Sequence, residues 1–333
     1  MAKSNEESVH SEPVQLLLGA IRKQFGKGAV IDLNGEALPG VEWLRSGSMA
    51  LDAALGNGYA RGRMVELYGA ESAGKTTLLL QAIAEAQKDG LTCAILDTEH
   101  ALDMHYARAL GIDTDKLIFS QPDNAEQALD MLDMMIRSGV ISLIGIDSTS
   151  ALVPRAELEG EVGDNLPGLQ ARLLSKSLRN IVGPAYQTKT TVIWISQIRK
   201  KLGVIFGSPE VVGVGEALKF YASQRLDIRR TGTLKDGDES LANAVKVTVK
   251  KNKVAPPYKV AEFNIIFGKG IDTQGELLDV AVARDVVDKA GAWYSFQGER
   301  IGQGRKNTLE FLEQNPDIME RVKTGLNEIH SEE

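Results

Sequence analysis

A glycine-rich segment near residue 70 has the residue types and the spacing needed to hold the phosphates of a nucleotide. Its letters, GAESAGKTT, fit the pattern G-x-x-x-x-G-K-[ST]. In this pattern the glycines let successive backbone N–H groups face the phosphates, the lysine supplies a cation, and the hydroxyl that follows binds Mg²⁺. We therefore predict that a triphosphate is held by Gly69, Ala70, Glu71, Ser72, Ala73, Gly74, Lys75, Thr76 and Thr77.

Polar residues at the ends of three apolar runs complete a hydrolytic site. Asp147 ends the run SLIGID and can hold the hydration shell of Mg²⁺, although it or Ser148 can also cap a helix. Glu99 follows CAILDT and can orient or deprotonate water, and a solvated loop glutamate is an equally good interpretation. Gln197 follows TVIWIS, where its amide can contact a γ-phosphate or satisfy nearby backbone groups.

The segments around these residues predict the sheet that positions them. Strand-like apolar runs alternate with helix-like segments between residues 63 and 196, which predicts an α/β fold with a mostly parallel twisted sheet and helices on both faces. The glycine-rich loop lies between the apolar run MVELY and the helical run KTTLLLQAIAEAQK, as a phosphate loop requires. The later runs RLDIRR, AVKVTVKK and AEFNIIF are separated by polar turns and predict antiparallel strands.

Other segments lie outside this regular pattern. Apolar residues at helical spacing from Val14 to Phe25 indicate an amphipathic N-terminal helix. Two segments rich in Gly and Pro follow buried strands and have no period, which is uncommon unless such segments are functional or disordered; they cover 154–168 and 198–215. We expect three parts: an N-terminal segment over 1–33, a nucleotide-binding core over 34–271 and a small α+β domain over 272–333.

Charge and composition narrow the class of protein. The chain of 333 residues has a formal charge of −7, but residues 199–259 carry 13 Lys/Arg against 6 Asp/Glu, a basic belt that suits a polyanion or is simply a solvated face. The polar N-terminus and the lack of a run of about 18 apolar residues predict a cytoplasmic protein with no membrane association. Cys93 lies in the run CAIL and is predicted to be a buried structural thiol.

In the order and spacing of its motifs the chain resembles the bacterial RecA recombinases, as a somewhat divergent member. The matching segments extend over nearly the whole chain and include DTEHALDMHYARALG, LPGLQARL, SQIRKKLGVIFGSPE, KNKVAPPYK and RIGQGRKNT. The resemblance implies a P-loop NTPase core that binds ATP and Mg²⁺. It further implies a helical homopolymer filament on single-stranded DNA, which pairs with homologous duplex DNA in strand exchange and repair. An SOS repressor, whose self-cleavage the filament promotes, and loader proteins are implied partners.

The resemblance also implies what individual residues do within one protomer. Lys75 and Thr76 bind phosphate and Mg²⁺, and Asp147 is the second Mg²⁺ carboxylate. Glu99 is the catalytic carboxylate, and Gln197 senses the γ-phosphate. Three further residues match positions near the nucleotide: Asp103, Tyr106 and Phe267.

Other residues are implied to act between neighbouring protomers. Lys251 and Lys253 match lysines that reach the neighbour's phosphates, as arginine fingers do in other ATPases. Phe220 matches an aromatic residue that crosses the interface, although core packing also fits the segment ALKFYA. The N-terminal helix resembles a segment that docks on the next protomer and mediates oligomerisation.

The two irregular segments correspond to the DNA-binding loops of the family. Basic side chains there can neutralise phosphates, glycines let the backbone approach the strand, and apolar side chains can wedge between bases. The expected contact residues are Gly160, Gly163, Gly168, Arg172, Arg179, Arg199, Lys200, Lys201, Leu202, Gly203, Phe206 and Gly207.

Several positions depart from the family pattern. VVGVGE follows PE where threonines are usual, Phe267 replaces a common tyrosine, and Ala70 replaces a loop proline. Two other functions fit the same core. A ring-forming DNA motor would assemble as closed hexamers rather than an open helix. A nucleotide-controlled filament scaffold would hydrolyse ATP without stimulation by single-stranded DNA.

Overall fold

The structure is a computed structural model that describes residues 11–30, 40–161, 168–200, 210–213 and 216–332. The chain divides into two compact units, residues 1–42 and 43–333, and each is considered by itself. None of the helices within these ranges combines the length and the apolar character that a bilayer crossing requires.

The N-terminal unit contains the predicted amphipathic helix. Helix α1 spans Glu12–Phe25, and a short 3-10 helix, η1, covers Lys27–Ala29. Basic residues in the last turn of α1, Arg22 and Lys23, complement the negative end of the helix dipole. None of its side chains is buried, and Leu16, Leu17 and Phe25 are more than half exposed. Since an apolar stripe of this kind is stable in water only when covered, α1 needs a partner surface.

The second unit is built on one large sheet whose parallel half confirms the predicted βαβ units. Its ten strands include the order β12-β11-β10-β9-β3-β7-β6-β4-β5, and β8 pairs with β7 beside this row. The central strands are buried on both faces, which explains their nearly continuous apolar runs. The parallel strands are β3 Met64–Gly69, β4 Cys93–Asp97, β5 Ile118–Ser120, β6 Leu143–Asp147 and β7 Thr191–Lys200.

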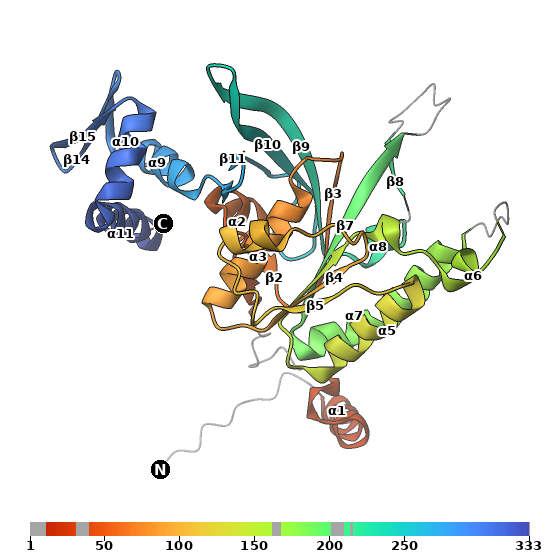
Figure 1. Ribbon diagram of the computed structural model, residues 1–333. Helices are drawn as coiled ribbons and strands as arrows, with labels where there is room; N and C mark the ends of the chain where they lie inside the picture. The colour runs from red at the N-terminus through yellow and green to blue at the C-terminus, as the bar shows by residue number, and fades with distance from the viewer. Residues whose placement is uncertain (1–10, 31–39, 162–167, 201–209, 214–215, 333) are drawn as a thin grey trace, which may run out of the picture. The chain divides into compact units, whose positions relative to one another are not determined.

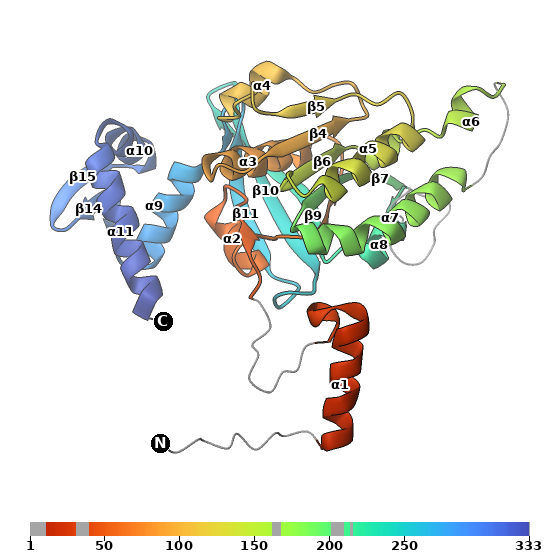
Figure 2. The same ribbon diagram turned by 90° about the horizontal axis from the view of Figure 1, so that it is seen from below.

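Helices cover both faces of this sheet, as predicted (Figure 1). Helices α2, α3 and α4 pack on one face around Leu55, Leu79 and Ala107, and α5, α7 and α8 pack on the other around Leu132 and Leu178. Figure 2 shows α5 and α7 running side by side. The bounds are α2 Met49–Leu55, α3 Lys75–Lys88, α4 Met104–Ala109, α5 Ala125–Ser138, α7 Leu169–Thr188 and α8 Glu216–Tyr221.

Cys93 lies on strand β4, inside this core. It is fully buried, and burial raises the pKa of its thiol to about 12. A thiol with a raised pKa and no access to solvent is a poor nucleophile, so Cys93 fills space, as its sequence context predicts.

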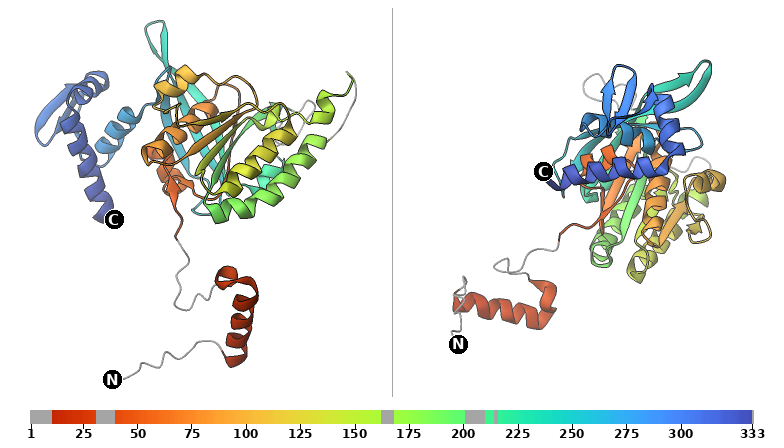
Figure 3. Two further views of the ribbon diagram at one scale, coloured as in Figure 1. Left: turned by 60° about the horizontal axis from the view of Figure 1, so that its bottom comes forward. Right: turned by 90° about the vertical axis from the view of Figure 1, so that its left-hand side faces the viewer.

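The antiparallel strands predicted after residue 224 extend the same sheet. Strands β9 Gln224–Asp236, β10 Glu239–Asn252 and β11 Val260–Ile266 pair antiparallel, and the short β12 Gly270–Ile271 follows at the edge. The hairpin of β9 and β10 is long and extends past its neighbours (Figure 3). Strand β9 also pairs in parallel with β3, where Gly69 lies opposite Ile228. The antiparallel region is therefore fixed directly beside the phosphate loop.

Short elements correct the expectation that residues 154–168 and 198–215 are irregular throughout. Helix α6, Arg155–Leu158, occupies part of the first segment. In the second, β7 continues to Lys200 and pairs with β8, Glu210–Val212, so that Ile198 faces Val212. The prediction was wrong at both ends of the second segment, where β-branched residues favour strands that pair as a hairpin. The glycines between these ends had indicated an irregular segment throughout. Three smaller elements are β1 Trp43–Leu44, β2 Tyr59–Ala60 and η2 Thr149–Ala151.

The C-terminal region has the mixed α and β composition expected of it. It has its own core, which contains Leu278, Tyr294, Leu312 and Val322. The boundaries proposed at 33/34 and 271/272 stay predictions. Its elements are α9 Thr273–Ala283, β13 Asp288–Ala290, β14 Trp293–Phe296, β15 Glu299–Gln303, α10 Arg305–Gln314 and α11 Pro316–Glu332.

A buried carboxylate fastens this region to the core. Glu276, on α9, accepts hydrogen bonds from the hydroxyl of Ser48 at 2.6 Å and from the backbone N–H of Met49 at 3.2 Å. Burial raises the pKa of Glu276 from its ordinary value of 4.5 to about 7, although these hydrogen bonds oppose the shift and Asp52 adds to it. The folded chain therefore holds a proton here between about pH 4.5 and pH 7 that the unfolded chain has lost.

We expect Glu276→Gln to flatten the pH dependence of stability. In the native chain this group contributes stability below pH 4.5, and the contribution is lost as pH rises to about 7. The loss is on the order of 3 kcal/mol, since each unit of pKa difference corresponds to about 1.4 kcal/mol. Glutamine keeps the acceptor for Ser48 and cannot ionise. Denaturant unfolding at pH 5, 6, 7 and 8 measures the slope, with the exposed Glu313→Gln as control; equal slopes for native and Glu276→Gln chains would refute the assignment.

Candidate active site

The phosphate loop connects the end of β3 to the start of α3, as its pattern predicts. Two of its glycines are required by the backbone. A Cβ on Gly69 would lie 2.3 Å from the carbonyl oxygen of Ile228 on the neighbouring strand. Gly74 has a φ of 98°, and a Cβ there would lie 2.4 Å from the side chain of Ile265. The loop can thus press against β9 and β11 only because these positions lack side chains.

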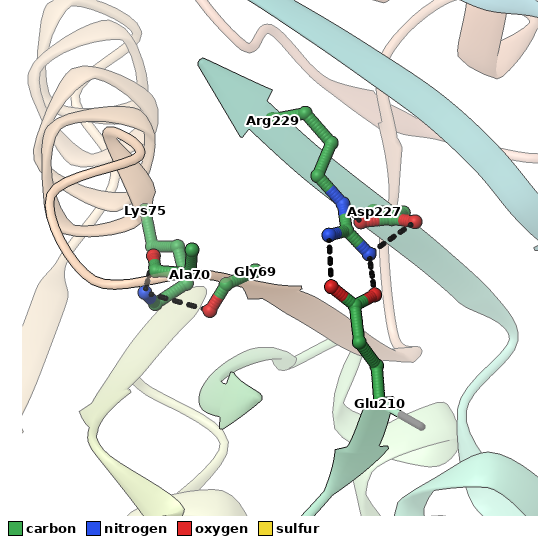
Figure 4. Close-up of polar contacts among 6 residues, drawn as sticks. All are labelled: Gly69, Ala70, Lys75, Glu210, Asp227 and Arg229. Atoms are coloured by element: carbon green, nitrogen blue, oxygen red, sulfur yellow. Dashed lines mark hydrogen bonds and ion pairs between the residues drawn. The ribbon is translucent and has the colours of Figure 1, made fainter. Parts of the chain in front are cut away.

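Lys75 lies inside this loop. Its ammonium group donates to the carbonyl oxygens of Gly69 at 3.2 Å and Ala70 at 2.7 Å, as Figure 4 shows. The side chain is buried, and burial lowers the pKa of Lys75, while Asp147 and Glu99 oppose the shift. A desolvated cation at the positive end of α3 is suited to bind a phosphate group strongly.

Thr76 and Asp147, the two residues expected to bind Mg²⁺, are in contact. The hydroxyl of Thr76 donates to the carboxylate of Asp147 at 2.6 Å. Burial raises the pKa of Asp147 to about 6, the contact with Thr76 lowers it, and Glu99 and Asp97 raise it further. A buried carboxylate among other carboxylates is stabilised by a cation, and a hydroxyl with a carboxylate is an oxygen donor pair that fits Mg²⁺.

Thr76 and Asp147 provide too few ligands for a metal site formed by protein groups alone. Within the residues that the structure describes, no group of three or more His, Cys, Asp and Glu side chains could hold a metal ion. Mg²⁺ in nucleotide sites is usually bound by one or two protein groups together with phosphates and water. The donor set is therefore compatible with Mg²⁺ that arrives with a triphosphate.

Glu99, which follows β4, and Gln197, which lies on β7, are also in contact. The amide nitrogen of Gln197 donates to Oε1 of Glu99 at 2.8 Å, and the hydroxyl of Ser148 donates to the same oxygen at 2.5 Å. Ser148 does not cap η2 with its side chain. Glu99 is nevertheless an exposed loop residue, and the amide of Gln197 donates to a side chain in this contact. Their roles in hydrolysis stay predictions.

A cavity of about 310 Å³ lies beside the loop and is large enough for part of a nucleotide. Tyr106 and Phe267 line it as expected, and the hydroxyl of Tyr106 lies 3.0 Å from that of Thr77. Asp103 is not among its lining residues; its carboxylate caps the N-terminus of α4 instead. The sequence did not predict the part of the cavity wall that β10, β11 and the turn after β11 supply, because no local motif marks it. Its residues are Asn243, Val245, Ile265, Ile266 and Gly268.

The predicted interface residues gather around α8. The ammonium group of Lys251 donates to the carbonyl oxygens of Lys219 at 2.8 Å and Phe220 at 3.1 Å, and so caps the C-terminal end of this helix. Lys253 is exposed nearby on the same chain segment. The ring of Phe220 is 68% exposed, which excludes the core-packing alternative within one protomer.

The predicted DNA-binding residues are described only in part. Gly168 has a φ of 74° and begins α7, from which Arg172 and Arg179 project as exposed side chains. Gly160 is exposed beyond α6, and Arg199 and Lys200 lie on β7. The remaining predicted contacts fall outside the described residues: Gly163, Lys201, Leu202, Gly203, Phe206 and Gly207.

An ion-pair cluster that the sequence analysis missed ties β8 to the sheet. Arg229, on β9, donates two hydrogen bonds to the carboxylate of Glu210, at 2.8 and 2.5 Å (Figure 4). It also donates to Asp227 at 2.7 Å, and both partners raise the pKa of Arg229. The returning end of the second loop is therefore held by the strand that lies beside the phosphate-loop strand.

Comparisons with known proteins agree with this geometry. The family model for the RecA N-terminal domain matches residues 12–272, and the model for the RecA C-terminal domain matches residues 275–330. Protein RecA of Acinetobacter baumannii (strain AYE) is 54% identical over 319 residues, which is 96% of this chain and 91% of that protein. Protein RecA of Delftia acidovorans is 53% identical over 324 residues, 97% of this chain and 88% of that protein. Protein RecA of Saccharopolyspora erythraea is 52% identical over 316 residues.

We expect Lys75→Ala to weaken nucleotide binding strongly without unfolding the chain. The variant loses the buried cation, and a charge-assisted hydrogen bond to phosphate is worth roughly 100-fold in affinity. Titration with a fluorescent ATP analogue measures the dissociation constant, and a turnover assay measures hydrolysis. Lys88→Ala, at the exposed end of the same helix, is the matched control and should bind normally. Normal turnover by Lys75→Ala would show that the phosphate site lies elsewhere.

Proposed function

The chain belongs to the RecA family, and from this premise we propose how its residues carry out the work of an ATP-driven DNA recombinase. Members of this family are DNA-dependent ATPases that form filaments on single-stranded DNA and pair it with homologous duplex. The observation that carries the residue-level proposal is the contact between Glu99 and Gln197. It places a carboxylate and an amide together at the edge of the sheet where the phosphate loop begins.

Lys75, Thr76 and Asp147 hold the triphosphate and its metal ion. The ammonium group of Lys75 binds phosphate oxygens, and the hydroxyl and carboxylate that now contact each other provide the two protein oxygens for Mg²⁺. When bound, Mg²⁺ neutralises the charge of the phosphates and aligns them for in-line attack. Glu99 orients and deprotonates the attacking water, because its carboxylate is close enough to raise the pKa of Asp147 and remains accessible to solvent.

Gln197 connects nucleotide state to the second DNA-binding loop. Its amide donates to Glu99 in this chain, and a γ-phosphate oxygen would compete for the same donor. The residues that follow pair directly with β8, which Arg229 holds through Glu210. A change of partner at Gln197 is thus transmitted along one short strand to both ends of the loop.

The protomer interface completes the hydrolytic site. Lys253 is exposed and projects from the segment that follows β10, and Phe220 presents its ring on the adjacent helix. We place Lys251 and Lys253 on the neighbour's phosphates in the filament, where they stabilise the charge of the transition state. The exposed apolar stripe of α1 supplies a second contact between protomers. An isolated protomer is therefore a weak ATPase.

DNA is held mainly through its backbone. Phosphates of the strand are neutralised by the basic residues at the two loops, Arg172, Arg179, Arg199, Lys200 and Lys201, and base pairing between strands supplies the specificity. Affinity should fall with salt by slightly less than one logarithmic unit of slope for each phosphate neutralised. The nucleotide-bound filament is also the form that meets an SOS repressor and loader proteins, in the cytoplasm where the chromosomal substrate lies.

ATP hydrolysis measured with and without single-stranded DNA tests this function. We expect strong stimulation by the strand, and negative-stain images should show open helical filaments only when a triphosphate is present. Closed hexameric rings would support a ring-forming motor. Filaments whose turnover ignores single-stranded DNA would support a nucleotide-controlled scaffold. Equal assembly with and without triphosphate would remove the proposed coupling.

We expect Lys253→Ala to lose at least about 10-fold of the DNA-stimulated turnover, as removal of an arginine finger does in other ATPases. Nucleotide binding by isolated protomers should remain within about twofold, because the side chain acts on the neighbour. Lys259→Ala, which changes another exposed lysine directly before β11, is the control. If Lys253→Ala weakened nucleotide binding equally in protomer and filament, the lysine would act within its own chain.

A further inference from the structure

We propose that Ser148 is a positioning residue for ATP hydrolysis, which fixes the carboxylate of Glu99 so that one oxygen stays available to the attacking water. This inference deepens the proposed function and rests on Glu99 being the catalytic carboxylate. The resemblance to the RecA family implies no role for Ser148, and its place in the sequence indicates only a possible helix cap.

The geometry makes Ser148 and Gln197 a pair of donors to a single oxygen. Both approach Oε1 of Glu99, the hydroxyl at 2.5 Å and the amide at 2.8 Å. A carboxylate accepts only, so the hydroxyl hydrogen of Ser148 points to Glu99. Since Oε1 already accepts two hydrogen bonds, Oε2 is the oxygen that can accept one from a water molecule. The two donors therefore decide which oxygen acts as the base.

The two donors differ in how firmly they are placed. Ser148 is fully buried, whereas Gln197 is the residue proposed to change partner when a γ-phosphate binds. Once Gln197 turns toward phosphate, Ser148 is the donor that remains on Oε1. Glu99 has a long and otherwise exposed side chain. Without a fixed partner this side chain would sample several rotamers, and the carboxylate would be aligned with the water for only part of the time.

The backbone around Ser148 is held by contacts that do not involve its hydroxyl. The carbonyl oxygen of Ser148 accepts from the hydroxyl of Thr98 at 2.8 Å. The carbonyl oxygen of Asp147 accepts from the backbone N–H groups of Thr98 and Glu99 at 2.8 and 3.2 Å. Removing the hydroxyl alone should therefore leave the ends of β4 and β6 joined, and the phosphate loop and Asp147 in place.

Kinetics of Ser148→Ala, Glu99→Gln and the double variant test this inference in the full-length chain on single-stranded DNA. We expect Ser148→Ala to lower kcat about 10-fold, the scale of one hydrogen bond to a charged group, with KM for ATP changed less than twofold. In the Glu99→Gln background the same substitution should change kcat less than twofold, because Ser148 acts through that carboxylate. Thermal unfolding and nucleotide titration of each variant verify that the fold and the binding site persist.

The outcomes separate this inference from the proposed function. If Glu99→Gln turns over normally, the catalytic assignment of Glu99 fails and the role of Ser148 fails with it. If Glu99→Gln is slow but Ser148→Ala turns over normally, only the positioning role is wrong. A tenfold loss from Ser148→Ala that is repeated in the Glu99→Gln background, or one that appears in KM instead of kcat, also contradicts it, since the hydroxyl would then act on the nucleotide or on the fold.

Discussion

The parallel pairing of β3, β7, β6 and β4 is the constraint on which the rest of the site depends. Parallel strands end at the same edge of a sheet, so residues from distant parts of the chain arrive together there. The phosphate loop leaves β3, Asp147 ends β6, and Glu99 follows the end of β4. Gln197 lies on β7 opposite Gly69, the last residue of β3. Their hydrogen bonds, at 2.6 Å between Thr76 and Asp147 and 2.8 Å between Gln197 and Glu99, are consequences of that shared edge.

Burial makes this edge sensitive to ligands. It lowers the pKa of Lys75 and raises that of Asp147, so both charged forms are disfavoured by the same loss of water. In the function that we propose, a triphosphate would stabilise the cation and Mg²⁺ would stabilise the carboxylate, so the two ligands together would offset the electrostatic cost of burial. Electrostatic interactions are also stronger away from bulk water, which favours a tight and discriminating site.

The sequence predicted those parts of the protein that are encoded locally. The phosphate loop, the alternation of strands and helices and the amphipathic α1 each depend on spacing within about 20 residues. Contacts between distant strands could not be predicted in this way. The parallel pairing of β9 with β3 brings Asn243 and Ile265 to the nucleotide cavity, and it sets Arg229 against Glu210. The periodicity of a sequence does not show which distant strands pair. In the same way, the role that we propose for Ser148 follows only from the distance between its hydroxyl and Glu99.

The hairpin of β7 and β8 gives a physical account of the unusual VVGVGE segment. Val212 pairs with Ile198 and Val211 with Arg199, so these two valines are part of a strand and not of an irregular loop. Valine and threonine are both β-branched and suit a strand equally, so Val211 and Val212 preserve the hairpin and remove only hydroxyls at these two positions. Contacts that those hydroxyls would make with DNA must come from backbone groups or from basic residues. The coupling that we propose from Gln197 to β8 needs only the strand pairing, so the valines leave it intact.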